Sequence, residues 1–236
     1  MKRLDKITGV VTNLAGTNSP ATVNAISSGE GVGTNAQFCN PTGVAADNLG
    51  GVYVSDADAN QIFTVASDGT ATVIAGQWWM SGSDNGVGTN AQFTVPAGLA
   101  YSSGFLYVAD SQNNLIRKID ATSKAVSTVA GQKPPAAAGH LDGAGTAATF
   151  KFPAGVAVSA DALYVSDTGG YIIRKIVLAT GAVTTLAGVF NTYLPFTNGI
   201  ATSATFYDPQ AIAVDSVGTT VYVADSGNNK IRKIAY

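Results

Sequence analysis

The residues best suited to chemistry are four aspartates, each at the end of a Tyr-Val-x-Asp phrase: Asp56, Asp110, Asp167 and Asp225. Carboxylates can transfer protons or hold a cation, so these are the first candidates for a reactive site. An aspartate that enters a tight turn can also accept hydrogen bonds from backbone N–H groups and from a nearby arginine. Arginines recur at one equivalent position in three units, and we interpret both sets as structural positions of a repeat. These arginines are Arg117, Arg174 and Arg232.

Calcium binding is the alternative role for the first of these aspartates. Asp56, Asp58 and Asn60 alternate along a short segment, and alternating oxygen ligands are typical of calcium loops. The segment lacks the glycine and the distal glutamate of an EF-hand, and the equivalent segments that begin at Asp110 and Asp225 carry only that one carboxylate each. We therefore predict no metal site and keep these three residues as calcium candidates.

Other catalytic arrangements need histidine or cysteine, and the chain contains one of each, His140 and Cys39. A Ser-His-Asp or Cys-His site needs a base beside its nucleophile, and a catalytic zinc site of the lyase type needs several imidazoles. A hydrolase or lyase with a metal in a central channel is the enzymatic alternative. The segments expected to line such a channel are small and apolar, as in Gly155–Val158. We therefore expect no catalytic residue and no cofactor.

The elements that must position these residues are repeated short strands. The marker aspartate recurs at spacings of 54, 57 and 58 residues, and each unit reads as four β-branched or aromatic runs bounded by Gly, Pro, Asn and Asp. Residues 7–16 match the last strand of a unit, so the sequence is circularly permuted by one strand. We predict one all-β domain over 1–236, a β-propeller of four blades of four antiparallel strands. The blade units are 17–76, 77–131, 132–188 and 189–236, and pairing of the N-terminal strand with the C-terminal blade closes the ring.

Two longer phrases carry a family resemblance: Tyr107–Ile119 and Tyr222–Ile234, each after a Pro-x-x-(Leu/Ile)-Ala strand. They resemble NHL repeats, and the resemblance covers essentially the whole chain. It implies a β-propeller. Propellers of this type serve as protein-interaction platforms, RNA-binding domains, sensor domains and, in one amidating lyase, a catalytic domain. This chain departs from the family's usual pattern because its units are longer and fewer, with the extra length in the Gly-rich connection after each Ala-Gly.

Binding specificity is expected where the repeats differ. Trp78 and Trp79 are the only tryptophans and lie in one connection, while Tyr193 and Phe196 lie in another. Adjacent residues point to opposite sides, so one tryptophan can pack on the blade while the other is exposed as a contact site. We predict a non-enzymatic binding or assembly scaffold that contacts a protein partner, or a second copy, through these loops. A glycan is the second option.

Composition limits the partners further. Charged residues make up 12% of the chain and the net charge is −2, which disfavours nucleic acid because phosphates require a basic surface. No run of about 18 apolar residues predicts membrane insertion. Met1 to Lys6 show no secretory signal, although the Thr- and Asn-rich composition favours an extracellular or cell-surface location. Two structural alternatives stay open: a fragment of a longer propeller, or two copies that pair through Met1–Gly16 and Ile231–Tyr236.

Overall fold

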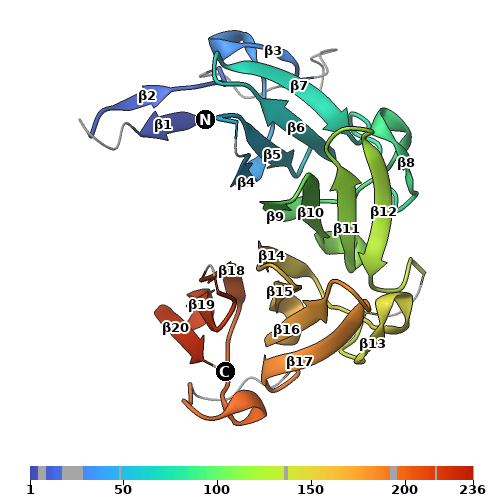
Figure 1. The fold of residues 1–236 in the computed structure, drawn as a ribbon, viewed down its shortest axis with the longest axis vertical. Helices are drawn as coiled ribbons and strands as arrows, with labels where there is room; N and C mark the ends of the chain where they lie inside the picture. Colours follow the sequence, from blue (N-terminus) through green and yellow to red (C-terminus); the bar gives the residue numbers. More distant parts are fainter. Residues whose placement is uncertain are drawn as a thin grey trace.

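The computed structural model describes residues 1–4, 9–17, 29–47, 49–135, 138–191, 196–215 and 217–235. In these ranges the chain forms β-strands and one-turn 3-10 helices, with no α-helix. Four antiparallel sheets follow one another around a common centre and form a four-bladed β-propeller (Figure 1). The predicted all-β propeller of four blades is therefore confirmed, although the described blades contain five strands or, in blade 4, three instead of four.

Each of the first three blades contains four consecutive strands and one short added strand at its outer edge. The order from the inner strand outward is β4, β5, β6, β7 and β3 in blade 1, β9 to β12 and β8 in blade 2, and β14 to β17 and β13 in blade 3. Blade 4 has the order β18, β19, β20. The bounds are β3 Gly31–Val32, β4 Pro41–Ala46, β5 Val52–Asp56, β6 Gln61–Val65, β7 Thr70–Ala75, β8 Gly86–Val87, β9 Pro96–Ser102, β10 Phe105–Asp110, β11 Leu115–Asp120, β12 Ala125–Ala130, β13 Gly143–Ala144, β14 Pro153–Val158, β15 Ala162–Asp167, β16 Ile172–Val177, β17 Ala182–Gly188, β18 Pro209–Val214, β19 Thr220–Asp225 and β20 Lys230–Ala235.

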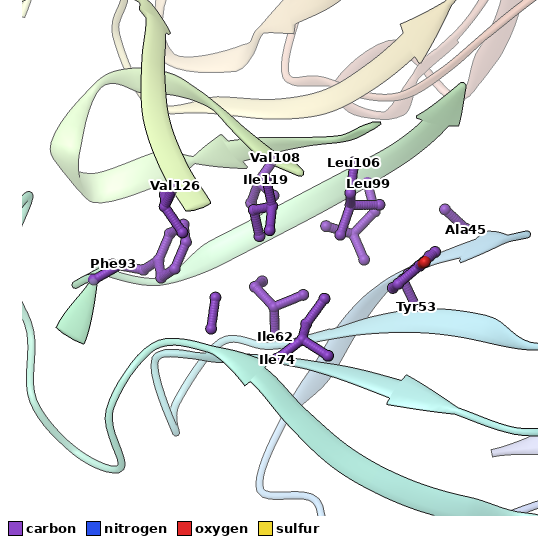
Figure 2. Close-up of a cluster of buried hydrophobic side chains, with 12 residues drawn as sticks. Ala45, Tyr53, Ile62, Ile74, Phe93, Leu99, Leu106, Val108, Ile119 and Val126 are labelled. Atoms are coloured by element: carbon purple, nitrogen blue, oxygen red, sulfur yellow. The ribbon is translucent and has the colours of Figure 1, made fainter. Parts of the chain in front are cut away.

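The hydrophobic core lies in layers between successive blades. Figure 2 shows the layer between blades 1 and 2, where Ile62 and Ile74 face Leu106, Ile119 and other apolar residues of the next blade. These four side chains are at most 3% exposed. Burying a side chain of this size contributes roughly 1.5–3 kcal/mol, so the contact with the next blade supplies much of the stability of each blade.

The connection between blades begins at a glycine in the left-handed region. Gly76 and Gly131 have φ values of 88° and 101°, which favour glycine. A Cβ at Gly76 would lie 2.3 Å from the carbonyl oxygen of Asn60, so a side chain there is also sterically excluded. The chain then runs to the outer edge of the next blade, where it adds the short strand and enters a 3-10 turn such as η2, Gly88–Asn90.

The predicted ring closure by the N-terminal strand is not what the structure contains. Strand β2 (Val11–Asn13) pairs with β1 (Lys2–Leu4), and no described strand pairs with the outer edge of β20. Figure 1 shows this β1–β2 hairpin and blade 4 at the two ends of an open arc. Local pairing has the lower entropic cost, because a short hairpin connection closes a much smaller loop than pairing between the two ends of the chain.

Candidate binding surfaces and buried carboxylates

The repeated aspartates are buried anchors of the turns, as blade 2 illustrates. The Asp110 carboxylate accepts hydrogen bonds from the Thr94 N–H, the Asn113 side chain and Arg117, each at 2.8 Å. Arg117 also donates to the carbonyl oxygens of Gln92 and Asp84, both at 3.0 Å. Asp110 and Arg117 have no exposed side-chain surface, so a substrate cannot reach them in this conformation. Burial raises the pKa of Asp110 to about 6, although Arg117 and the other donors oppose this shift.

Blades 3 and 4 repeat this arrangement. Arg174 lies 3.4 Å from Asp167, and Arg232 lies 2.8 Å from Asp225. Each arginine also donates a hydrogen bond to the connection that precedes its blade. Arg174 donates to the Thr149 carbonyl oxygen, and Arg232 donates to the Thr205 carbonyl oxygen. Burial raises the pKa of Asp167 to about 7, against hydrogen bonds and charge from Lys151 and Arg174. The geometry therefore gives these pairs a role in holding each blade to its incoming connection.

Blade 1 departs from this arrangement because Phe63 stands at the arginine position. Its ring packs edge to face on Phe38, with centroids 5.3 Å apart. Asp56 is fully buried and accepts hydrogen bonds from the N–H groups of Cys39 and Asn40, both at 2.7 Å. Burial raises the pKa of Asp56, with the backbone donors acting against it. Sequence comparison of the units could have revealed this difference, since Phe63 aligns with three arginines.

The calcium candidates Asp56, Asp58 and Asn60 all accept hydrogen bonds from groups of the protein. Asp58 accepts a hydrogen bond from the Asn40 side chain at 3.2 Å, and the Asn60 side-chain oxygen accepts one from the Val95 N–H in the next blade at 2.9 Å. Asn40 thus donates to both Asp56, through its N–H, and Asp58, through its side chain, whereas Asn60 is bound to the next blade. The described residues contain no group of three or more His, Cys, Asp or Glu arranged to hold a metal ion.

Cys39 is a poor nucleophile in this position. Burial, with Asp56 and Asp58 nearby, raises the pKa of its thiol to about 11. The thiol therefore stays protonated near neutral pH, whereas thiolate is the reactive form. His140 lies elsewhere, stacked on Phe190 with ring centroids 3.8 Å apart.

The tryptophan pair forms an exposed turn between β7 and β8. The two rings meet edge to face with centroids 6.0 Å apart; Trp78 is half-buried and Trp79 is 41% exposed. Met80, which follows, is 47% exposed. The turn is fixed to blade 1 by a hydrogen bond of 3.1 Å from the Trp79 N–H to the Ala59 carbonyl oxygen. The turn therefore presents an exposed apolar surface on a backbone that is hydrogen-bonded to blade 1.

Phe196 lies at a separate place, beside blade 4. The Lys230 ammonium and the Arg232 guanidinium form cation–π contacts with its ring, each 4.6 Å from the ring centroid. Phe196 also lines a groove along β20. Tyr193 lies outside the described residues. The tryptophan pair belongs to the connection between blades 1 and 2, and Phe196 belongs to the connection between blades 3 and 4, so blades 2 and 3 separate the two places along the arc (Figure 1).

One pocket was missed at the sequence level, at the junction of blades 3 and 4. Its volume is about 330 Å³, and its lining includes Phe152, Tyr171, Tyr207 and Asp208. Tyr171 and Tyr207 meet edge to face at 5.4 Å, and Phe152 is 47% exposed. The sequence feature that could have indicated this pocket is Tyr171, because the equivalent residue of the other units is asparagine.

Comparison with known proteins identifies the repeat. The family model described as NHL repeat matches residues 38–64. The human NHL repeat-containing protein 2 is 32% identical over 174 residues, which is 70% of this chain and 24% of the relative. The chain thus spans about a quarter of that relative's length.

Solved structures support the same architecture. An auxiliary nutrient binding protein from Bacteroides ovatus aligns with a TM-score of 0.66 and 22% identity, over 86% of this chain and 49% of that one. A protein of the same description from Bacteroides thetaiotaomicron aligns with a TM-score of 0.67 and 20% identity, over 97% of this chain and 50% of that one. At this identity the likeness concerns the fold. In the described ranges, the protein has no helix of the length and apolarity that crossing a bilayer requires.

Proposed function

Because this chain is an NHL-repeat β-propeller, we propose that it acts as a non-enzymatic binding module that holds a protein partner on the turn Gln77–Met80. The observation that carries the proposal is the exposed apolar surface of Trp79 and Met80. Tryptophan is enriched among residues that dominate binding energy at protein interfaces, and methionine is over-represented in such contacts.

The held backbone of the turn supports this role. Besides the Trp79 bond to blade 1, the Met80 N–H donates to the Gln77 carbonyl oxygen at 3.0 Å, and Ser81 forms a β-bridge with Phe93, which lies just before β9. A turn that is already ordered loses little conformational entropy when a partner binds. The surface is therefore prepared for binding before the partner arrives.

The remaining chemistry of the chain supports a non-enzymatic role. The repeated carboxylates are buried in hydrogen-bond networks, the Cys39 thiol has a raised pKa, and His140 is stacked on Phe190. A general acid or base must lie within hydrogen-bond reach of its substrate. None of these groups meets that requirement together with a second catalytic group in the described part of the chain.

The test uses the two tryptophans as site-specific reporters, because all tryptophan emission of the chain comes from this turn. Protein ligands are selected with the wild-type chain from a displayed peptide library. Binding is measured in Trp79→Ser, in Met80→Ser and in the control Leu49→Ser, which alters a leucine that is 92% exposed elsewhere. We expect a shift of tryptophan emission on binding, and at least about tenfold weaker binding in both turn variants but not in the control. Equal affinities in all variants would assign the partner to another surface.

A glycan is the second candidate, and the pocket of Phe152, Tyr171 and Tyr207 favours it. Exposed aromatic faces beside the Asp208 carboxylate offer stacking and hydrogen bonding to a sugar ring. Two Bacteroides proteins that share this fold are described as nutrient binding, which agrees with a nutrient molecule as the alternative ligand. Tyr171→Asn restores the residue of the other units in its left-handed position, φ 61°, and removes the aromatic surface. Saccharide binding that this variant abolishes, while Trp79→Ser does not, would favour the glycan.

A further inference from the structure

Among the described residues, no strand covers the outer edge of β20, although a strand covers this edge in the other blades. In blades 1 to 3, strands β7, β12 and β17 lie on the outer edges of β6, β11 and β16. At the corresponding place in blade 4 there is an open groove of about 610 Å³. One wall is β20, Lys230–Ala235, and the other includes Gly199 and Ile200. The position of Gly199 and Ile200 in the unit is that of β13, which pairs with β17 in blade 3. The groove therefore has the location of one missing strand.

The residues along this edge are those of an interior strand. Ile231 is 75% exposed, whereas its equivalents Ile62, Ile116 and Ile173 are fully buried. Exposed sheet edges are usually protected by charges or prolines placed there for that purpose. Lys233 is not such a feature, because Lys118 and Lys175 occupy the same position in complete blades. The edge is consequently open to a further strand.

The chain contains a segment with the sequence of that strand. Residues 8–16 read Thr-Gly-Val-Val-Thr-Asn-Leu-Ala-Gly, and residues 180–188, which contain β17, read Thr-Gly-Ala-Val-Thr-Thr-Leu-Ala-Gly. The register agrees as well. Lys2 pairs with Asn13 and Leu4 with Val11, just as Arg174 pairs with Thr185 and Ile176 with Val183. Strand β1 thus lies on β2 as β16 lies on β17.

Strand β1 pairs with β2 over a shorter length than β16 pairs with β17. It contributes three residue pairs to β2, whereas β16 contributes five to β17. Val11 is 55% exposed, but Val183, at the same position in the completed blade, is 1% exposed. Val11 thus exposes apolar surface that a complete blade would bury, and Ile231 exposes apolar surface that the following blade covers at the equivalent positions of blades 1 to 3.

We propose that β2 of a second copy of this chain fills the groove beside β20 and exchanges its own β1 for this partner. The repeat register places Asn13 of one copy opposite Arg232 of the other, Thr12 opposite Lys233, and Val11 opposite Ile234. The completed blade contains three strands from one copy and one strand from the other. The added strand buries Val11 beside Ile234, and blade 1 of the second copy, which stays attached to this strand, lies against Ile231 as blade 4 lies against Ile173.

The position of β2 favours a second copy over closure within one chain. The Gly16 N–H donates to the Gly33 carbonyl oxygen at 2.9 Å, and the Thr17 N–H donates to the Ala36 carbonyl oxygen at 3.0 Å. These bonds hold the end of β2 on blade 1, at the opposite end of the arc from β20 (Figure 1). Closure within one chain would have to rearrange the buried contacts between blades, whereas exchange between copies opens only the β1–β2 pairing.

This assembly goes beyond the proposed binding function and uses different residues. Each copy offers one β2 donor and one β20 acceptor, so the contact is heterologous and produces closed rings or open chains of copies. Loss of binding at Trp79 leaves it unaffected. The two proposals can therefore fail separately.

The test is disulfide trapping between two proteins that each carry one cysteine. Both contain Cys39→Ser; one carries Thr12→Cys and the other Lys233→Cys. After mixing and mild oxidation, we expect a linked species of twice the 23.9 kDa mass of one copy. Light scattering of the unmodified chain should show a mass above 23.9 kDa that rises with concentration.

Two controls define the register. Lys175→Cys with Thr184→Cys in one chain reproduces the same pair inside blade 3 and should form an intrachain disulfide. Thr12→Cys mixed with Lys230→Cys is out of register and should link far less. Absence of the expected species while the blade 3 control links would overturn the proposal. So would an intrachain disulfide in a dilute chain that carries both Thr12→Cys and Lys233→Cys.

Discussion

Blades 3 and 4 have nearly the same repeat sequence but differ in how much of it is buried. Tyr164 and Ile173 of blade 3 are fully buried, whereas the equivalent residues of blade 4, Tyr222 and Ile231, are 44% and 75% exposed. The difference arises because blade 3 has a following blade and a fourth strand, and blade 4 has neither in the described structure. A blade of this propeller thus depends on its neighbour for burial, and the same residue contributes differently at the two positions.

The largest expected effect tests the buried ion pair. Arg174→Met leaves the Asp167 carboxylate buried without its cation, so we expect a loss of about 3–5 kcal/mol in the free energy of unfolding at pH 8. Arg232→Met in blade 4 should cost less, because blade 4 packs against a neighbour on one side and can open locally. Urea unfolding followed by circular dichroism measures both variants. Equal losses would mean that the two blades unfold as one unit.

The tyrosine pair tests the contact between blades directly. Tyr164→Ala removes a buried ring and its hydrogen bond of 3.2 Å to the Gly218 carbonyl oxygen, and should cost about 3 kcal/mol. Tyr222→Ala alters a half-exposed ring and should stay within about 0.5 kcal/mol at low protein concentration. Thermal unfolding of both variants at one concentration makes the comparison. A large loss in Tyr222→Ala would show that a partner covers blade 4 under those conditions.

The repeat units predicted the fold well, because period, strand composition and turn residues are local properties of the sequence. The Tyr-Val-x-Asp phrases mark β5, β10, β15 and β19, and part of the N-terminal segment forms a strand, β2. Its partner was not predicted correctly, since residues 2–4 resemble residues 232–234 and compete for the same edge. The aromatic pocket also escaped prediction, because its residues come from two blades and meet only in the folded chain.

The pH dependence of stability separates the interior aspartates from surface carboxylates. The folded pKa of Asp167 is about 7, above its ordinary value of 3.8, so the folded state binds the proton more tightly than the unfolded state. Stability from this group is present below pH 3.8 and is lost as the pH rises towards 7, by at most about 1.4 kcal/mol per pH unit. Asp167→Asn should flatten this part of the curve.

The matched control for this prediction is Asp120→Asn, which alters a surface carboxylate. Hydrogen bonds from the Ser123 and Thr122 N–H groups lower the pKa of Asp120. Its contribution therefore has the opposite sign and is lost as the pH falls through the lowered folded pKa. Urea midpoints between pH 4 and 8 make the comparison. Parallel curves for wild type and Asp167→Asn would contradict the raised pKa.

The smallest effect comes from a single methylene at one position of two blades. Ile173→Val removes it from a fully buried side chain and should cost about 1 kcal/mol, whereas Ile231→Val alters an exposed side chain and should cost almost nothing in a dilute sample. The comparison becomes sharper with concentration. If a second copy covers blade 4, the cost of Ile231→Val should rise towards that of Ile173→Val as the protein concentration increases, because blade 1 of the second copy then covers Ile231 as blade 4 covers Ile173. If Ile231→Val lowers the free energy of unfolding by almost nothing at every concentration, Ile231 remains exposed and no second copy covers blade 4.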